Sequence, residues 1–238
     1  ENNVQALERE ARSREAFVAA FAHELKTPLT AIIGYADLLR SRKLTEERHF
    51  TAANYIYTEG KRLEAMALKL LDIIVTKQGN VQRKEQAAEQ YFAYLKLVYE
   101  QENYDFSFSY EEGTVFGESN LIKTVLVNLV DNACKASEEG GKIIIGGQSE
   151  DAGYRFFVED RGIGIPKEEI QRITEAFYMV DKSRSRSKNG AGLGLSLCVE
   201  ILKLHHTELI IESTVGEGTR MSFLLPAVAE KRERQCEE

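Results

Sequence analysis

The chain has 238 residues, of which 43% are hydrophobic and 29% charged, a composition typical of globular proteins with one or two domains. A formal net charge of −7 argues against general nucleic-acid binding, which requires a basic surface. Three widely spaced cysteines exclude a disulfide framework or metal-binding pattern and fit a reducing compartment. The sequence contains no signal peptide and no apolar run of about 18 residues, so we expect this segment to make no membrane contact.

The first part of the chain predicts two long helices, over residues 1–42 and 46–77, with Thr45 as N-cap of the second. At about 100° per residue, one face of the first helix collects Phe17, Phe21, Leu25, Leu29, Ile32, Ala36 and Leu39. The second helix has a similar stripe of Ile56, Leu63, Leu70 and Ile74. Because two antiparallel helices bury too little alone, we expect a second copy to complete a four-helix bundle.

After residue 80 the pattern changes to alternating strands and helices. The predicted helices cover residues 86–101, 118–138, 167–176 and 192–204. The predicted strands are FSFSY, KIIIGG and YRFFVED, followed by a terminal hairpin in which TVGEG joins LIIES to RMSFLLP. The fold class is therefore α+β, with an expected helical domain over 1–79, an α/β domain over 80–228 and a polar tail over 229–238.

The stretch FAHELKTPLT, residues 21–30, places His23 and Thr27 one turn apart, opposite the apolar face, with Glu24 beside the histidine. Pro28 cannot donate to the Glu24 carbonyl, so it strains this turn of the helix. An exposed imidazole with an adjacent carboxylate suits a nucleophile that must meet a separate partner. The alternative is an ordinary solvent-facing histidine, and the helix alone leaves both interpretations open.

Polar residues also gather on one face of the helix predicted over 118–138. Asn128, Asn132 and Lys135 lie there at helical spacing. Amide oxygens can coordinate Mg²⁺, and a lysine can neutralise phosphate. A plain polar helix face is the alternative.

Two glycine segments follow. Asp160 ends a hydrophobic strand just before Gly162 and Gly164, where a carboxylate could bind the amino group of a base; a tight turn is the alternative. GAGLGL, with Gly190, Gly192 and Gly194, then opens a helix whose amides could bind phosphate. Its spacing matches neither the dinucleotide-binding nor the P-loop pattern.

The basic stretch between these segments contains Lys182 and Arg184. Such a run is usually a solvated loop, and beside a phosphate site it could also act as a lid.

Together, and in this order, these motifs resemble those of sensor histidine kinases, the transmitter half of bacterial two-component systems. HELKTPLT resembles the H box, NLVDNACKAS the N box and DRGIGIP the G1 box. Phe177 in EAFYMVDKSRS matches the F box, GAGLGLSL the G2 box, and GEGT, which ends in Thr219, the last glycine turn. The resemblance extends from about residue 15 to residue 226.

The resemblance implies a role for each matching residue. His23 would be the phosphoacceptor and Glu24 its general base, while Asn128 and Asn132 would hold Mg²⁺ and Lys135 would contact the phosphates. Asp160 would bind the adenine amino group. The remaining nucleotide contacts would come from Gly162, Gly164, Phe177, Lys182, Arg184, Gly190, Gly192, Gly194 and Thr219.

The family also implies a dimeric helical hairpin followed by the α/β sandwich of gyrase-type ATPases. ATP would phosphorylate His23, and the phosphoryl group would pass to an aspartate of a response-regulator receiver domain. His23, Glu24 and Thr27 form His-Glu-x-x-Thr, which resembles the motif of kinases that also dephosphorylate their regulator. The segment is expected to be the cytoplasmic part of a longer, membrane-anchored sensor. The alternatives are a pseudokinase dimeric scaffold and a gyrase-type ATPase that uses ATP binding as a conformational switch.

The chain departs from the family pattern in two places. Ala136 and Ser137 follow Lys135 where an aromatic residue is common, and His205-His206 replaces a frequent His-Gly. The histidine pair has no further metal ligands nearby in sequence, so a metal role is not expected there.

Overall fold

The computed structural model describes residues 2–77, 82–180 and 192–226 of the chain. Its contacts divide the chain into two compact units. One comprises Glu1–Asp72 and Glu175–Leu193, and the other comprises Ile73–Thr174 and Gly194–Glu238. The sequence predicts boundaries after residues 79 and 228, and those domain limits stay a prediction.

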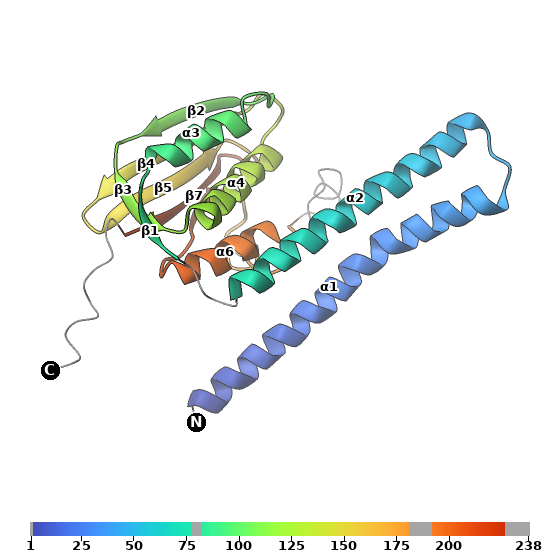
Figure 1. Ribbon diagram of the computed structural model, residues 1–238, viewed down its shortest axis with the longest axis horizontal. Coiled ribbons are helices and arrows are strands. Elements are labelled where there is room, and N and C mark those ends of the chain that lie inside the picture. Colours follow the sequence, from blue (N-terminus) through green and yellow to red (C-terminus); the bar gives the residue numbers. More distant parts are fainter. Residues whose placement is uncertain (1, 78–81, 181–191, 227–238) are drawn as a thin grey trace. The chain divides into compact units, whose positions relative to one another are not determined.

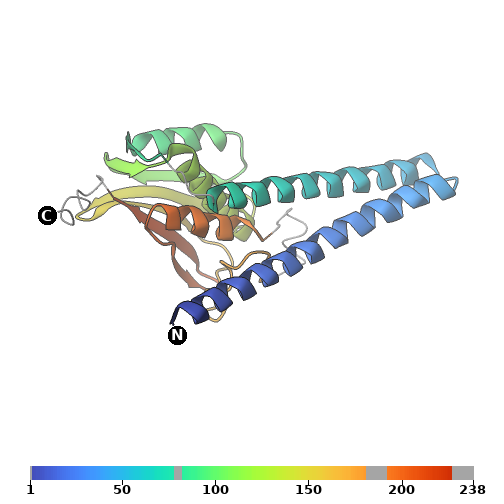
Figure 2. The same ribbon diagram turned by 60° about the horizontal axis from the view of Figure 1, so that its bottom comes forward.

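The first unit is built on two antiparallel helices, α1 (Asn2–Ser41) and α2 (Glu46–Lys77), joined by a short loop (Figures 1 and 2). The Thr45 hydroxyl accepts a hydrogen bond from the Arg48 N–H (3.4 Å), which is the predicted N-cap of α2. Helix α1 continues through Pro28. The predicted ranges of both helices, 1–42 and 46–77, are therefore confirmed to within one residue at each end.

The surfaces that α1 and α2 turn toward each other lie beside the predicted apolar stripes. The buried residues of these helices, among those described, are Glu24, Pro28, Ala52, Arg62 and Met66. Across the hairpin the rings of Tyr35 and Tyr55 stack with centroids 4.7 Å apart. Leu29, in the predicted stripe of α1, is 49% exposed. None of the described side chains in these stripes is fully buried within one chain.

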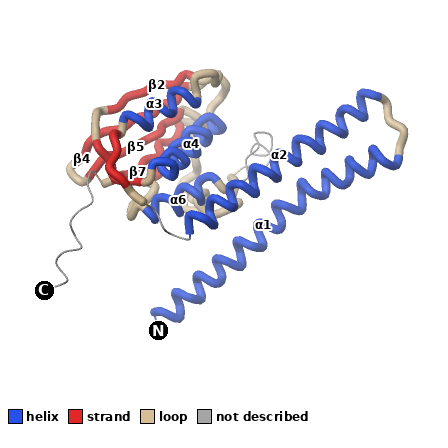
Figure 3. The backbone as a smooth tube through the Cα atoms, in the orientation of Figure 1, coloured by secondary structure: helices blue, strands red, loops and turns tan. Residues whose placement is uncertain are grey.

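The second unit contains a five-stranded sheet in the order β2-β4-β5-β7-β6. Strand β2 runs parallel to β4, and the other neighbours are antiparallel. The strands are β2 (Asp105–Tyr110), β4 (Lys142–Glu150), β5 (Gly153–Asp160), β6 (Ile210–Thr214) and β7 (Gly218–Leu225). Helices α3 (Glu89–Val98), α4 (Ser119–Ala136) and α6 (Gly194–Leu204) lie against one face of this sheet (Figure 3). The predicted fold, a helical region followed by an α/β domain, is confirmed.

Alternation along β5 determines which side chains face the helices. Tyr154, Phe156 and Val158 are buried at every second position, with Phe156 packed against Phe223 of β7 (ring centroids 5.4 Å apart). Asp160 is the next residue in this series. The alternation that places Tyr154, Phe156 and Val158 in the core therefore also places the Asp160 carboxylate on the helix-covered face, at the end of the strand.

Two predicted elements are wrong in part. The first half-turn of the helix predicted over 86–101 belongs to a short strand, β1 (Lys84–Ala87), which pairs with β3 (Thr114–Gly117) in a separate two-stranded sheet. Residues 167–174, predicted as helix, form consecutive turns. Their backbone hydrogen bonds differ in spacing: the Arg172 N–H donates to the Glu169 carbonyl three residues earlier, and the Ile173 N–H donates to the same carbonyl four residues earlier.

Among the described residues, no helix has the length and apolar character needed to cross a bilayer.

Candidate active site

His23 projects from α1 with 70% of its side chain exposed, as predicted for a group that meets a separate partner. Its Nδ1 lies 3.7 Å from Oε1 of Glu24. This leaves Nε2 as the ring nitrogen that is not turned toward the carboxylate. The pair presents one free nitrogen at the surface and one beside a potential proton acceptor.

Glu24 differs from its exposed neighbour because its side chain is only 5% exposed. Its Oε2 lies 3.7 Å from Nη2 of Arg62, on α2. The sequence placed Glu24 on the flank of the helix and gave no partner for it. The carboxylate is instead enclosed between the two helices of the hairpin.

Thr27 is exposed on the His23 side of α1. A threonine in a helix often back-bonds to the carbonyl four residues earlier. In the part of α1 that the structure describes, Thr30 makes this bond, to the Lys26 carbonyl (2.7 Å), and Thr27 does not. The Thr27 hydroxyl is therefore not used for a purely structural bond to the His23 carbonyl.

Asn128 lies in the middle of α4 and is 7% exposed. Its Nδ2 donates to the Thr124 carbonyl (2.8 Å), which fixes the amide and directs Oδ1 away from its own helix. A Cβ atom at Gly194 would lie 2.8 Å from that oxygen, so only glycine lets α6 begin so close to α4. This contact joins the predicted N box to the last glycine of the G2 box.

Asn132 follows one turn later on α4 and is half-buried. Its Nδ2 is buried and has no hydrogen-bond partner among the described residues. A buried amide donor without a partner costs free energy unless a bound group satisfies it. Lys135 is half-buried at the end of the same helix.

Asp160 is 7% exposed, and its Oδ1 accepts a hydrogen bond from the Gly162 N–H (2.8 Å). Burial raises the pKa of Asp160 above its ordinary value, while the N–H groups of Gly162 and Thr219 act in the opposite direction. A Cβ at Gly162 would lie 2.4 Å from the Ala136 carbonyl oxygen, so this turn packs directly on the end of α4. The Ile163 N–H donates to the same carbonyl (3.2 Å).

Helix α4 therefore contacts two glycine segments, one at Asn128 and one at Ala136. Eight helical residues span about 12 Å. The Asp160 turn lies at one end of this length, the start of α6 lies at the other, and Asn132 stands between them. An elongated ligand with a base at one end and an anionic group at the other matches this arrangement.

Gly164 and Thr219 lie near the Asp160 turn. Gly164 has a φ of +67°, and Thr219 pairs with Asp160 in the β5–β7 ladder. Thr219 is buried, and its hydroxyl lies 2.9 Å from the Ser213 hydroxyl, which in turn donates to the Gly218 carbonyl. These contacts stabilise the glycine turn between β6 and β7. The nucleotide contact expected of Thr219 stays a prediction.

Phe177 and Gly192 belong to the first unit. Phe177 is buried, adopts a φ of 66°, and donates its N–H to the Gly192 carbonyl (2.7 Å). Gly192 also has a positive φ, of 66°. Lys182, Arg184 and Gly190, the remaining predicted nucleotide contacts, lie outside the described residues.

His205 is a core residue. Its Nε2 accepts from the Glu118 N–H (3.0 Å) and its Nδ1 lies 2.8 Å from the Ile201 carbonyl, so backbone groups occupy both nitrogens. His206 takes the left-handed conformation (φ 55°) expected of the glycine that it replaces, and the turn is preserved. Within the described ranges, no three or more His, Cys, Asp or Glu side chains are grouped so that they could hold a metal ion.

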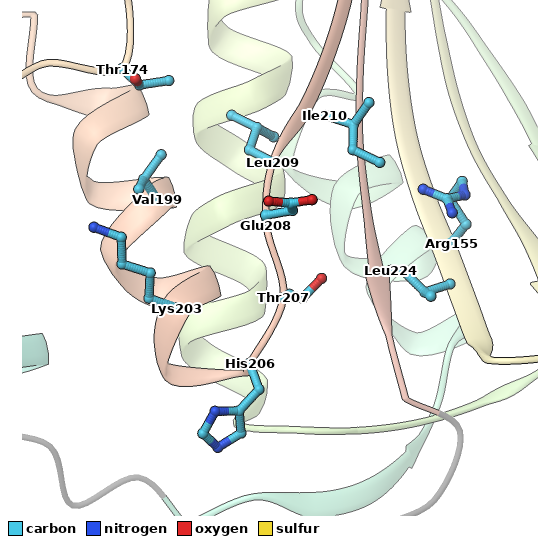
Figure 4. Close-up of a pocket in the computed structure, with 10 residues that line it drawn as sticks. All are labelled: Arg155, Thr174, Val199, Lys203, His206, Thr207, Glu208, Leu209, Ile210 and Leu224. Atoms are coloured by element: carbon cyan, nitrogen blue, oxygen red, sulfur yellow. The ribbon is translucent and has the colours of Figure 1, made fainter. Parts of the chain in front are cut away.

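A hollow of about 790 Å³ lies elsewhere in the second unit, around the edge strand β6 (Figure 4). It is lined by Arg155, Thr174, Val199, Lys203, His206, Thr207, Glu208, Leu209, Ile210 and Leu224. None of the predicted site residues lines it. Arg155 pairs with Glu150, and Lys203 pairs with Glu200 at 3.0 Å. This hollow therefore shares no residue with the predicted site around α4.

Comparison with known proteins matches both units. Residues 13–73 match the His Kinase A (phospho-acceptor) domain, and residues 117–229 match the histidine kinase-, DNA gyrase B- and HSP90-like ATPase family. The phosphate regulon sensor protein PhoR of Haemophilus influenzae is 31% identical over 219 residues, covering 90% of this chain and 52% of PhoR. Sensor protein SrrB of Staphylococcus aureus is 28% identical over 218 residues, covering 88% of this chain and 37% of SrrB.

Among solved structures, histidine kinase ThkA in complex with response regulator protein TrrA matches with a TM-score of 0.76 and 26% identity. This match covers 95% of the present chain and 67% of the ThkA chain. The chain spans about half the length of PhoR and less of SrrB, so these likenesses concern only part of each relative.

Proposed function

This chain belongs to the family of sensor histidine kinases, and on that premise we propose that it transfers the γ-phosphoryl group of ATP to His23. The group then passes to an aspartate on the receiver domain of a response regulator. The observation that carries the proposal is the pairing of an exposed His23 (70%) with a buried Glu24 (5%), Nδ1 to Oε1 at 3.7 Å.

In the proposed step, Nε2 of His23 attacks the γ-phosphorus, the bond to the β,γ-bridging oxygen breaks, and ADP leaves with that bonding pair. The carboxylate of Glu24 takes the Nδ1 proton as the ring loses its lone pair at Nε2. A separation of 3.7 Å is longer than a hydrogen bond, as is common before substrate binds. Most of the rate would come from positioning and charge neutralisation.

The nucleotide is proposed to lie along α4. Asp160 would accept a hydrogen bond from the adenine amino group, and the phosphates would lie toward Asn128 and the start of α6, where helix amides favour anions. The buried Asn132 Nδ2, which lacks a partner among the described residues, is a donor that a phosphate oxygen would satisfy. This orphaned amide supports a polyanionic ligand at this point.

Asn128 and Asn132 are proposed to hold Mg²⁺ through their amide oxygens, the donor type that this cation prefers. When bound, the ion would neutralise charge on the triphosphate. The lysine at the end of the same face, Lys135, would add a second positive charge.

Since ATP is the proposed substrate, we assign this segment to the cytoplasm. We propose that it is part of a longer sensor protein that is anchored in the membrane.

We also propose a homodimer. The described side chains of the stripes predicted on α1 and α2 are half-buried or exposed within one chain, with Leu29 among the exposed ones. The exposed apolar side chains of Ile33, Leu68 and Leu71 accompany them. Exposed apolar surface on this scale favours association. A second copy packing its own hairpin on these stripes would give a four-helix bundle.

A second activity, removal of phosphate from the response regulator, is proposed for the same helix. Thr27 is exposed one turn from His23, and its hydroxyl is not used for a back-bond in the described part of α1. It could position a water for in-line attack on an aspartyl phosphate docked at His23.

Incubation with γ-labelled ATP, followed by acid treatment of the protein, tests the kinase proposal. Phosphohistidine is acid-labile, so label that is lost in acid and absent from His23→Gln supports it. A pseudokinase scaffold or a gyrase-type ATPase switch would retain no label, and the latter would still release phosphate. Either result would replace the kinase assignment.

A further inference from the structure

Arg62 lies in the middle of α2 with 6% of its side chain exposed, although the neighbouring Lys61 is 59% exposed. A guanidinium in this position loses most of its hydration, and it is tolerated only where anionic groups compensate. Two carboxylates do so. Arg62 Nη2 lies 3.7 Å from Glu24 Oε2 on α1, and its Nη1 lies 3.7 Å from Glu59 Oε2 on its own helix.

Neither pair is close enough for a hydrogen bond. Glu24 Oε2, Glu59 Oε2 and the Nε and Nη2 atoms of Arg62 are buried without a hydrogen-bond partner among the described residues. The three side chains therefore form a loose cluster of one cation between two anions, with spare donors and acceptors. Small shortening of either distance would convert a long ion pair into a charge-assisted hydrogen bond.

The two oxygens of Glu24 have separate neighbours. Oε1 lies 3.7 Å from Nδ1 of His23, and Oε2 lies 3.7 Å from Nη2 of Arg62. One carboxylate thus connects an exposed imidazole on α1 to a buried guanidinium on α2. We propose that Arg62 is a positioning residue for His23 phosphorylation, holding the Glu24 carboxylate oriented toward the His23 ring. This inference rests on the proposed function.

The physical need for such a residue follows from burial. A glutamate has three rotatable side-chain bonds, and a buried carboxylate without a cation beside it would turn outward to water. This change would remove it as a proton acceptor for Nδ1. Glu59, one turn before Arg62, provides the second anion that keeps the guanidinium in the gap between the helices.

The test measures initial rates of His23 phosphorylation over a range of ATP concentrations in the whole protein. Arg62→Gln is expected to lower kcat at least tenfold while KM for ATP changes less than twofold, because the proposed nucleotide residues on α4 and in the Asp160 turn belong to the other unit. Arg62→Lys keeps a buried cation and the fold, but a point charge cannot replace the planar fork, so an intermediate kcat is expected. Lys61→Gln, which removes an exposed cation from the adjacent position, should match wild type.

A double-mutant cycle separates positioning from a general effect on folding. If Arg62 acts through Glu24, adding Arg62→Gln to Glu24→Gln should lower kcat less than twofold further. Losses that multiply in the double variant, or a kcat for Arg62→Lys and Arg62→Gln equal to that of wild type, would overturn the inference. Failure of the proposed function is a different result, in which wild-type protein takes up no acid-labile label at all.

Discussion

Asp160→Asn separates the binding role of this carboxylate from its effect on folding. Asp160 Oδ1 already accepts a hydrogen bond from the Gly162 N–H (2.8 Å), and an asparagine can preserve that bond through its own Oδ1. The substitution then places an NH₂ group where the second carboxylate oxygen was. An adenine amino group would meet a donor in place of an acceptor.

The expected loss follows from the type of bond. A hydrogen bond to a charged group contributes about 1.5–3 kcal/mol, and leaving a buried donor unpaired costs a similar amount. Loss of the hydrogen bond alone, about 1.5–3 kcal/mol, corresponds to a roughly 10- to 150-fold increase in the Kd for ATP. We therefore expect at least a tenfold loss of affinity.

Stability should respond differently. Burial raises the pKa of Asp160 in the folded protein, so the folded state binds a proton more readily than the unfolded chain does. The free energy of unfolding consequently includes a component that is present at low pH and is lost as pH rises through the folded-state pKa. Asp160→Asn cannot titrate, so the variant should lack this decline between acidic and neutral pH.

Titration calorimetry with ATP and urea unfolding at pH 4.5 and pH 7 measure the two effects. Glu159→Gln is the matched control, because Glu159 lies next along β5 on the opposite face and pairs with Arg220 at 2.7 Å. It should leave the Kd for ATP unchanged. An Asp160→Asn variant that binds ATP as tightly as wild type would refute the adenine assignment, whatever its stability.

Four further outcomes are expected. Asn132→Ala should reduce His23 phosphorylation at least 100-fold with unchanged circular dichroism, since the proposed metal and phosphate contact is lost; activity near wild type would contradict the site. Thr27→Ala should spare phosphorylation of His23 but slow release of phosphate from the regulator at least tenfold, and the reverse pattern would mark Thr27 as structural. Burial lowers the pKa of His205 below 6.5, so only the unfolded chain gains a proton as pH falls below that value. Urea unfolding should therefore show stability lost between pH 7.5 and pH 5.5, with a smaller loss in His205→Gln; equal losses would exclude His205 as the cause. Light scattering at micromolar concentration should give twice the mass of one chain, and a monomer would contradict the bundle.

The helix limits of the hairpin were predictable because local signals determine them. Thr45 provides the cap that starts α2, and acidic Glu46 and Glu47 occupy its first turn. The strands β4, β5, β6 and β7 followed from apolar runs bounded by glycine and polar turns. Strand β1 could not be found this way, since KEQA has no apolar alternation and exists only because β3 pairs with it.

Arg62 was missed for a related reason. Its surroundings, GKRLE, are typical of an exposed helical segment, and the sequence stripe chosen for α2 ran through Ile56, Leu63 and Leu70. The buried positions are instead Ala52, Arg62 and Met66. Periodicity places Arg62 next to the inner face of α2, where a charged side chain is normally expected to reach water. Nothing in the sequence indicates that this arginine is buried, because the carboxylate that faces it lies on the other helix.

The glycines of the site show how contacts between distant segments create a requirement that a local pattern cannot reveal. A side chain at Gly194 would collide with Asn128, and one at Gly162 would collide with the Ala136 carbonyl. Both obstacles lie on α4, far from either glycine in sequence. The sequence predicts a glycine turn at Gly162 and a phosphate-binding helix start at Gly194, but it gives no partner for either. The structure gives each a partner on the helix that carries the proposed metal and phosphate contacts. Glycine is required at both positions because the chain passes so close to α4. A larger residue at either position should therefore weaken nucleotide binding more than it destabilises the sheet.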